Sequence, residues 1–336
     1  FFLIITFVCS IMDLLIGFKA AGFLFLLTVG IPGNVFILLQ FTYIRVFEKK
    51  LLPTNMILMA LAAVNLLVLL SRCIPESLNS VGLKDLLDDP ECKLVLFCFR
   101  VNRAMSICVT SFLSCYQCIL IAPKRGLWLW IKKTIRPNVL IILITLLFIN
   151  LSVYPYFILN TRARRNLTTS PYTLHLVYCD ADFLTYFAYV TTGSIYAIRD
   201  FISVGLMTAS GGYIVYRLVC HERSMKGMRS SDKFQSRTVE QKASRAVILL
   251  VSLYVLLFGL DNSMWIYTLT LSNANPGMNE IRIFLASSYS AFSAIVIIST
   301  NPRLDQCFIF CTRNRQLPLL TDQSSENNGV VYAISK

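Results

Sequence analysis

Seven long apolar runs divide this sequence. They lie near residues 17–42, 55–74, 92–121, 138–160, 187–216, 246–271 and 281–300. An α-helix needs about 20 predominantly apolar residues to cross a hydrocarbon core about 30 Å thick. Inside lipid, only helices and closed barrels satisfy their own backbone hydrogen bonds. The pattern therefore predicts an all-α membrane protein, a bundle of seven transmembrane helices.

The composition agrees with a membrane-embedded chain. Of the 336 residues, 56% are hydrophobic and only 15% are charged, which is more apolar surface than a soluble core buries. We expect residues 1–302 to form one membrane domain and the polar residues 303–336 to form a mostly disordered tail. Residues 1–12 are too short to span a bilayer. They fit either the apolar core of a signal peptide or an irregular extension before the first helix.

Positive charge is distributed unevenly between the two sets of loops. About two thirds of the 31 lysines and arginines lie in the tail and in the loops after the first, third and fifth runs, and such loops are retained in the cytoplasm. The sequence therefore predicts an N-terminus outside the cell and a cytoplasmic C-terminus.

Two features of the predicted outer side agree with this orientation. Asn166 begins Asn-Leu-Thr, an acceptor for N-linked glycosylation in secretory compartments. Cys92 lies at the outer start of the third run, and Cys179 shares an outer loop with Asn166. An oxidising compartment allows these two cysteines to form a disulfide, and the alternative is two unrelated thiols.

Other kinds of site have little support in the sequence. The two histidines, His175 and His221, and the 11 cysteines do not have the spacing of a zinc site. No nucleophile and base motif is visible, and the net charge of +13 is not interleaved with aromatic residues as in nucleic-acid modules. We therefore expect no enzyme activity, no cofactor or metal, and no nucleic-acid partner.

Charged residues inside the apolar runs are costly in lipid and normally face the bundle interior. Five stand out: Arg100 and Arg103 in the third run, Arg199 and Asp200 in the fifth, and Asp261 in the sixth. At about 1.5 Å per residue, all lie roughly 12 to 16 Å below the predicted outer boundary, so we expect them to share one layer. Arg199 and Asp200 diverge by about 100° around their helix and are predicted to pair with other helices.

Two interpretations of this layer stay open, a network of interhelical ion pairs and a ligand-binding site. Three arginines against two aspartates leave one cation without a protein counter-ion, which favours a small anionic or electron-rich ligand. Arg103 is the predicted main anchor, because a guanidinium holds a carboxylate through two parallel hydrogen bonds. Separately, the apolar-run amides Asn34 and Asn65 are expected to form interhelical hydrogen bonds worth about 0.6 to 2 kcal/mol.

Five short segments occur in a specific order and spacing. They are residues 69–75 (LLSRCIP), 105–114 (MSICVTSFLS), 198–200 (IRD), 212–215 (GYIV) and 299–303 (STNPR). Together they resemble the vomeronasal type-1 receptors and their fish olfactory relatives, over about residues 30–305. The chain departs from that family at residues 293–294 (SA), where many members have Ser-Pro, and at residues 100–104 (RVNRA), where Arg-Gly is usual.

The resemblance implies a G-protein-coupled pheromone receptor in the plasma membrane of sensory neurons. Such a receptor detects a small chemical cue and activates an inhibitory-type G protein. Bitter-taste receptors, another chemosensory class, match the quoted segments less well. A transporter is disfavoured because no internal repeat or matching pair of interrupted helices is visible.

The predicted inner side is strongly basic. Attraction to anionic membrane lipid explains part of this charge, and contact with the G protein explains the rest. The residues expected to contact the G protein are Lys124, Arg125, Arg217, Arg223 and Arg245. Cys307 and Cys311, four residues apart beyond the last run, are candidates for palmitoylation.

Overall fold

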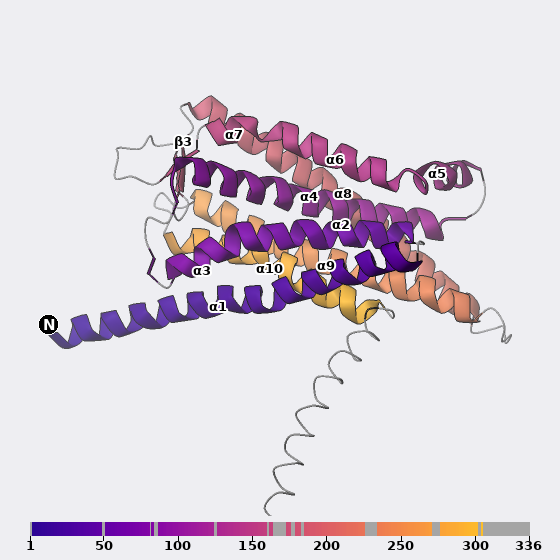
Figure 1. Cartoon of the computed structure of the whole chain (residues 1–336), viewed down its shortest axis with the longest axis horizontal. Coiled ribbons are helices and arrows are strands. Elements are labelled where there is room, and N and C mark those ends of the chain that lie inside the picture. Colours follow the sequence, from indigo (N-terminus) through magenta and orange to yellow (C-terminus); the bar gives the residue numbers. More distant parts are fainter. Residues whose placement is uncertain are drawn as a thin grey trace, which may run out of the picture.

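The structure is a computed structural model of the chain. It describes residues 2–48, 51–80, 82–83, 87–123, 126–159, 161–163, 173–175, 179–182, 185–225, 234–270, 276–301 and 304. Within these residues, long helices run side by side and one small sheet lies at one end of the bundle (Figure 1).

The first half of the chain contributes three long helical segments. α1 covers Phe2–Tyr43 and continues as a π-helical turn over Ile44–Glu48; α2 (Pro53–Val68) continues through a π-helical turn (Leu69–Cys73) into α3 (Ile74–Ser80); α4 covers Asp89–Ile121. Local sequence signals place two of the helix starts. Pro53 is the first residue of α2, and Asp88 and Glu91 form a capping box at the start of α4, as expected for helix N-termini.

The second half contributes the remaining helices. They are α5 (Leu127–Ile135), α6 (Val139–Val153), α7 (Pro155–Leu159), α8 (Tyr186–Met225), α9 (Phe234–Thr270) and α10 (Pro276–Thr300). Six of the described helical segments are long and apolar enough to cross a membrane, and α5 with α6, bent by 76°, can count as a seventh span. α6 and α7 together cover most of the predicted fourth run, so the helix bundle agrees with the predicted architecture.

The helices are longer than the apolar runs that locate them. α1 begins at Phe2, so the expectation of an irregular extension over residues 1–12 is wrong for the described residues 2–12. The residues before Pro32 contain no proline, so nothing in this stretch prevents a continuous helix. α8 ends at Met225 and α9 begins at Phe234, because Lys, Arg, Glu and Gln beyond the apolar core still favour helix.

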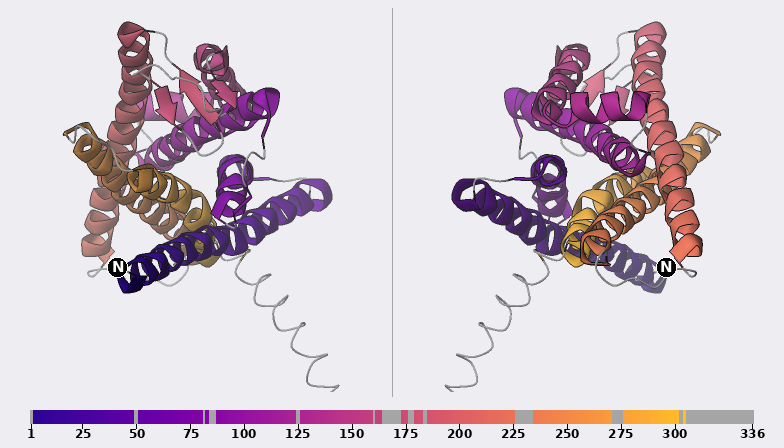
Figure 2. Two further views of the ribbon diagram at one scale, coloured as in Figure 1. Left: turned by 90° about the vertical axis from the view of Figure 1, so that its left-hand side faces the viewer. Right: turned by 90° about the vertical axis from the view of Figure 1, so that its right-hand side faces the viewer.

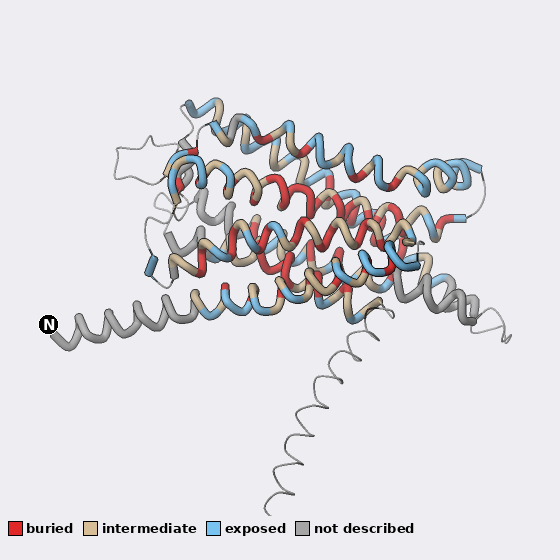
Figure 3. Tube along the Cα trace, viewed as in Figure 1, coloured by how far each residue is buried: buried red, intermediate tan, exposed pale blue. Residues whose placement is uncertain are grey.

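The core of the bundle is built around α4 and α2. Buried residues concentrate along these two helices, whereas α5 and α6 are largely exposed (Figure 3). α1 runs along one edge of the bundle (Figure 2) and packs against α10. Their approach is close because a Cβ added at Gly33 would lie 2.9 Å from the Ala294 Cβ, and one added at Gly30 would lie 2.9 Å from the Ala291 Cβ.

The small sheet and a disulfide define one end of the bundle, called the disulfide end below. Strands β1 (Thr161–Ala163), β2 (Thr173–His175) and β3 (Cys179–Asp182) pair antiparallel in the order β1-β3-β2. Cys92 at the start of α4 is bonded to Cys179 of β3, as the sequence predicted. The opposite end, where α5 lies, is called the α5 end.

Several predicted sites fall outside the described residues. These are the glycosylation acceptor Asn166, the basic residues Lys124 and Arg125, the cysteines Cys307 and Cys311, and the tail from residue 305 onward. Their assignments stay predictions.

Candidate functional site

One carboxylate joins three helices in the half of the bundle nearer to the disulfide end. Asp261 of α9 accepts a hydrogen bond from Nη2 of Arg103 on α4 at 2.8 Å. Its other oxygen accepts from Nε of Arg282 on α10 at 3.2 Å. The sequence indicated Arg103 and Asp261 as members of this layer but not Arg282, the second residue of the seventh apolar run.

A second cluster connects α8 to the junction of α6 and α7. Arg199 donates from Nε and Nη2 to Oδ1 of Asp200, at 2.9 and 2.7 Å, and from Nη1 to the hydroxyl of Tyr154 at 2.5 Å. The prediction that Arg199 and Asp200 do not pair is therefore wrong. Adjacent Cβ atoms do diverge by about 100°, but the long, flexible arginine side chain folds back onto the neighbouring carboxylate.

Arg100 lies three residues before Arg103 but faces a different set of partners. Its guanidinium lies near the side chains of Tyr154 and of Tyr196 on α8, whose rings lie 4.9 Å apart. The two arginines therefore lie in two adjoining parts of the predicted charged layer. Arg103 faces α9, and Arg100 faces the tyrosines around Arg199.

A third ion pair was not anticipated from the sequence. Nη2 of Arg72 lies 3.1 Å from Oε1 of Glu76, and both side chains are almost fully buried. The Arg72 guanidinium also lies 5.5 Å from the centre of the Phe99 ring on α4, a cation–π distance. Glu76 was assigned to an outer loop, but the helix continues past the predicted end at residue 74 and buries it. Arg72 itself stands in one of the five quoted segments.

Among the described residues, arginines outnumber acids in the three clusters. The clusters contain five arginines and three acids: Arg72, Arg100, Arg103, Arg199 and Arg282 against Glu76, Asp200 and Asp261. The count from the sequence, three arginines and two aspartates, omitted three of these residues. Arg100, Arg282 and Glu76 also make further interactions, so the inference of one arginine without a counter-ion stays a prediction.

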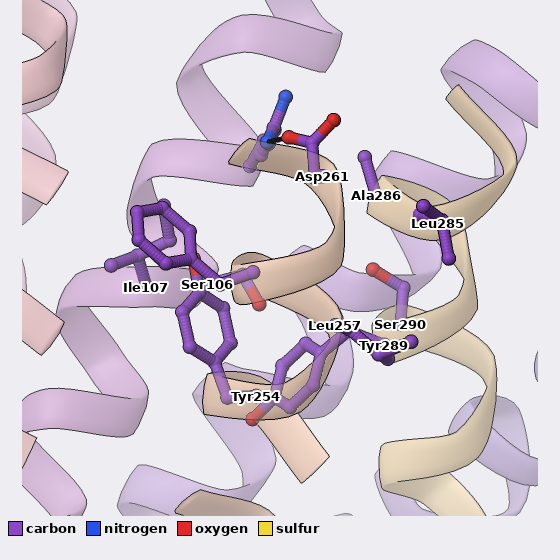
Figure 4. A pocket seen from close by; sticks show the side chains of 11 residues that line it. Ser106, Ile107, Tyr254, Leu257, Asp261, Leu285, Ala286, Tyr289 and Ser290 are labelled. Atoms are coloured by element: carbon purple, nitrogen blue, oxygen red, sulfur yellow. Dashed lines mark hydrogen bonds and ion pairs between the residues drawn. The ribbon is translucent and has the colours of Figure 1, made fainter. Parts of the chain in front are cut away.

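A small cavity adjoins the Asp261 cluster. Its volume is about 20 Å³, which is room for about one water molecule. α4, α9 and α10 line it, with Asp261 toward one end and the rings of Tyr254 and Tyr289 toward the other (Figure 4). The cavity therefore combines a charged end with an aromatic end.

A hydrogen-bonded hub lies next to this cavity. The Asn65 side chain of α2 donates to Ser293 Oγ at 2.9 Å and accepts from Ser106 Oγ at 2.6 Å and from Ser290 Oγ at 3.4 Å. Ser106 and Ser290 also line the cavity. Asn34 of α1 donates to the Ser290 carbonyl at 3.0 Å. The expected interhelical role of both asparagines is confirmed, and the hub ties α1, α2, α4 and α10 to the cavity wall.

A much larger cavity, about 480 Å³, opens at the α5 end. It is lined by residues from the start of α2, the end of α4, the first half of α9 and the end of α10, together with Arg136. Among these are Thr54, Tyr116, Gln117, Val247 and Asn301. α4, α9 and α10 thus line both cavities, so a movement of any of these helices changes both.

The predicted G-protein contacts fall only partly within the described structure. Arg217, on the part of α8 at this end, is half-buried, and Arg245, in the first half of α9, is exposed. Arg223 lies on the last turns of α8, where only the backbone is described. Arg136, one of the basic residues of the predicted inner side, is the described arginine that lines the large cavity.

Comparison with known proteins gives a consistent picture. Residues 19–310 match the family described as "Vomeronasal organ pheromone receptor family". The chain is 38% identical over 309 residues to "Olfactory receptor class A-like protein 1" of Danio rerio, covering 91% of this chain and 96% of that protein. It is 28% identical over 323 residues to "Vomeronasal type-1 receptor 1" of Homo sapiens, covering 92% and 88%. It is also 26% identical over 278 residues to "Vomeronasal type-1 receptor 43" of Mus musculus, covering 82% and 83%.

Proposed function

The chain belongs to the vomeronasal organ pheromone receptor family, and from this membership we propose that it detects a small anionic or electron-rich chemical cue and activates an inhibitory-type G protein. Membership itself makes the chain a multi-pass chemosensory G-protein-coupled receptor of the plasma membrane, and not an enzyme. The ligand class, the type of G protein and the orientation belong to the proposal.

In the proposed orientation, the disulfide end faces the outside of the cell. Disulfides persist in oxidising compartments, which supports this placement for Cys92 and Cys179. The α5 end then faces the cytoplasm, in agreement with the predicted retention of basic loops. The cue reaches the bundle from the disulfide end, and the G protein meets the large cavity at the α5 end.

The observation that carries the ligand class is the sharing of one carboxylate by two guanidiniums beside a cavity. Arg103 and Arg282 both bind Asp261, so two guanidiniums share one carboxylate. A guanidinium has five N–H donors in a fixed fork, and the Arg103 fork borders the cavity. An anionic group entering there accepts parallel hydrogen bonds from this fork.

The small cavity beside Asp261 has room for about one water molecule, so ligand binding there requires the surrounding helices to move. A ligand larger than one or two water molecules must widen the space between α4, α9 and α10. Because the same three helices line the large cavity at the α5 end, this widening alters the surface offered to the G protein. The ligand shifts the equilibrium between helix arrangements to the extent that it binds one of them more tightly.

Nucleotide exchange on a purified G protein tests this proposal. The full chain is reconstituted with an inhibitory-type or a stimulatory-type heterotrimer. GTP binding to the G protein is then measured in the presence of carboxylates, sulfates, amines and neutral analogues. We expect acids to accelerate exchange on the inhibitory type only, and pertussis toxin to abolish the response. Acceleration by amines alone would overturn the ligand class, and acceleration only on the stimulatory type would overturn the coupling.

A further inference from the structure

The short helix α5 has an exposed face that the fold leaves uncovered. The side chains of Leu127 and Trp130 are 70% and 65% exposed. They are three residues apart and therefore lie on the same side of the helix. Large apolar side chains this exposed, in a chain whose neighbouring helices cross a membrane, require a partner of matching chemistry.

The opposite side of α5 is held firmly against the bundle. The Trp128 ring stacks against Tyr213 of α8, with centroids 6.4 Å apart. Lys132 Nζ donates to the carbonyls of Leu120 and Ala122 at the end of α4, at 3.0 and 2.6 Å. These contacts fix the rotation of α5, so the exposure of Leu127 and Trp130 is a consequence of how the helix is docked.

The direction of α5 places that exposed face along a membrane surface. α5 is bent by 76° from α6, and α6 is the apolar segment that enters the bilayer three residues after α5 ends. A helix nearly perpendicular to a spanning helix runs nearly parallel to the membrane plane. Amphipathic helices with tryptophan and leucine on one face and basic residues on the other lie at this level.

The charge on α5 selects the kind of lipid. Lys133 is exposed near the end of α5. The sequence contains no Asp or Glu between Glu91 and Asp180, so no acid lies nearby along the chain. Basic residues at a membrane surface attract anionic lipid headgroups.

We propose that α5 is a membrane-surface helix: Leu127 and Trp130 insert into the boundary between headgroups and acyl chains, and Lys133 binds anionic phospholipid headgroups. The occupant is the membrane leaflet in which α6 is embedded. The inference requires only that the chain spans a membrane. It does not depend on which ligand or G protein the receptor uses. Because Lys132 holds the end of α4, the position of α5 at the membrane also supports one wall of the large cavity.

Tryptophan fluorescence tests the insertion directly. The chain has three tryptophans, so Trp128→Phe with Trp265→Phe leaves Trp130 alone. In nanodiscs without G protein, we expect lipids brominated near the headgroup to quench Trp130 at least twofold and aqueous iodide to quench it little. Quenching by iodide without quenching by brominated lipid would overturn the proposal. Shielding of Trp130 that appears only after a G protein is added would also overturn it, because the face would then be a protein interface.

Photo-crosslinking tests the headgroup contact on the otherwise unaltered full chain, so it does not rely on the tryptophan variants. Phosphatidylserine with a photoactivatable headgroup should label the tryptic peptide of residues 126–132 several-fold more than the matching phosphatidylcholine. The variant Lys133→Gln should remove this preference. Arg245→Gln, an exposed basic residue on α9, is the matched control and should leave it unchanged. Equal labelling by the two lipids, or a preference that survives Lys133→Gln, would contradict headgroup binding.

Discussion

Arg103 on α4 and Asp261 on α9 form a 2.8 Å ion pair across the bundle, and Asp261 is also held by Arg282 on α10. Asp261 is 5% exposed, so its charge depends on these two partners. Removing one partner of a buried ion pair costs about 3–5 kcal/mol, because the remaining charge is left uncompensated.

Asp261→Asn is therefore expected to destabilise the receptor strongly, since two guanidiniums would lose their shared carboxylate. The loss should appear as a lower thermal inactivation temperature in detergent and as reduced surface expression. Asp200→Asn is the control: Asp200 pairs with Arg199 on its own helix and has a more exposed side chain than Asp261, so its loss should cost less. Equal stability of the Asp261→Asn and unaltered receptors would show that the cluster does not hold α4, α9 and α10 together.

Gly30→Ala is predicted to disturb the packing of α1 on the bundle. The new Cβ would lie 2.5 Å from Leu69 Cδ1 and 3.0 Å from the Ala291 backbone. Overpacking of this kind costs about 1–3 kcal/mol. Gly205→Ala on α8 is the matched control, because nothing lies within 4 Å of a Cβ there. Thermal inactivation of both variants in detergent would measure the difference, and equal stability would contradict the close approach of α1.

Asn65→Ala should weaken the connection between the cavity wall and α2. It removes the hydrogen bonds to Ser106 and Ser293, each worth about 0.6 to 2 kcal/mol between membrane helices. A double-mutant cycle of Asn65→Ala with Ser293→Ala, followed by thermal inactivation, isolates one of these bonds. Strictly additive losses would mean that the two side chains are not coupled.

Asn166→Gln tests the proposed orientation. In the sequence, the acceptor lies between β1 and β2, two strands that the structure places at the disulfide end. We expect a glycosidase-sensitive mass shift in the unaltered receptor that disappears in this variant, because the oligosaccharide is added on the lumenal side. Cleavage of this segment by a protease confined to the cytoplasm of intact cells would contradict the proposed orientation.

Apolar runs and helix breakers predicted the type and order of the spanning helices. The described residues contain six spans, or seven if the bent pair α5 and α6 counts as one. The runs and breakers did not locate the helix ends, because the helices continue beyond the ends of the apolar runs. Glu76 is an example: it was assigned to a loop, yet it is buried beside Arg72. The depths estimated along each helix correctly predicted that Arg103 and Asp261 lie in one layer, where they form an ion pair.

Partner choice was beyond the same reasoning. Arg199 contacts Asp200 because its long side chain can fold back onto the neighbouring residue. The spacing of the two residues in the sequence does not show this. Arg282 was missed because a charge in the first turn of an apolar run looks the same as a boundary residue. The cavity at the α5 end depends on how four helices approach one another, so no single segment indicates it.

The most direct test of the anion-binding account is the dose response of Arg103→Ala to an acidic agonist and to its neutral analogue. Loss of one partner of a buried charge pair costs about 2–5 kcal/mol, which is about 30-fold to several thousand-fold in affinity at 1.4 kcal/mol per decade. Arg103→Lys is the control, because lysine keeps the charge beside Asp261 but lacks the planar fork. The account predicts a large rightward shift for the acid, a smaller one in Arg103→Lys, and little change for the neutral analogue at near-normal surface expression. Equal weakening of both ligands together with low surface expression would contradict it, because Arg103 would then serve only to hold α4 to α9.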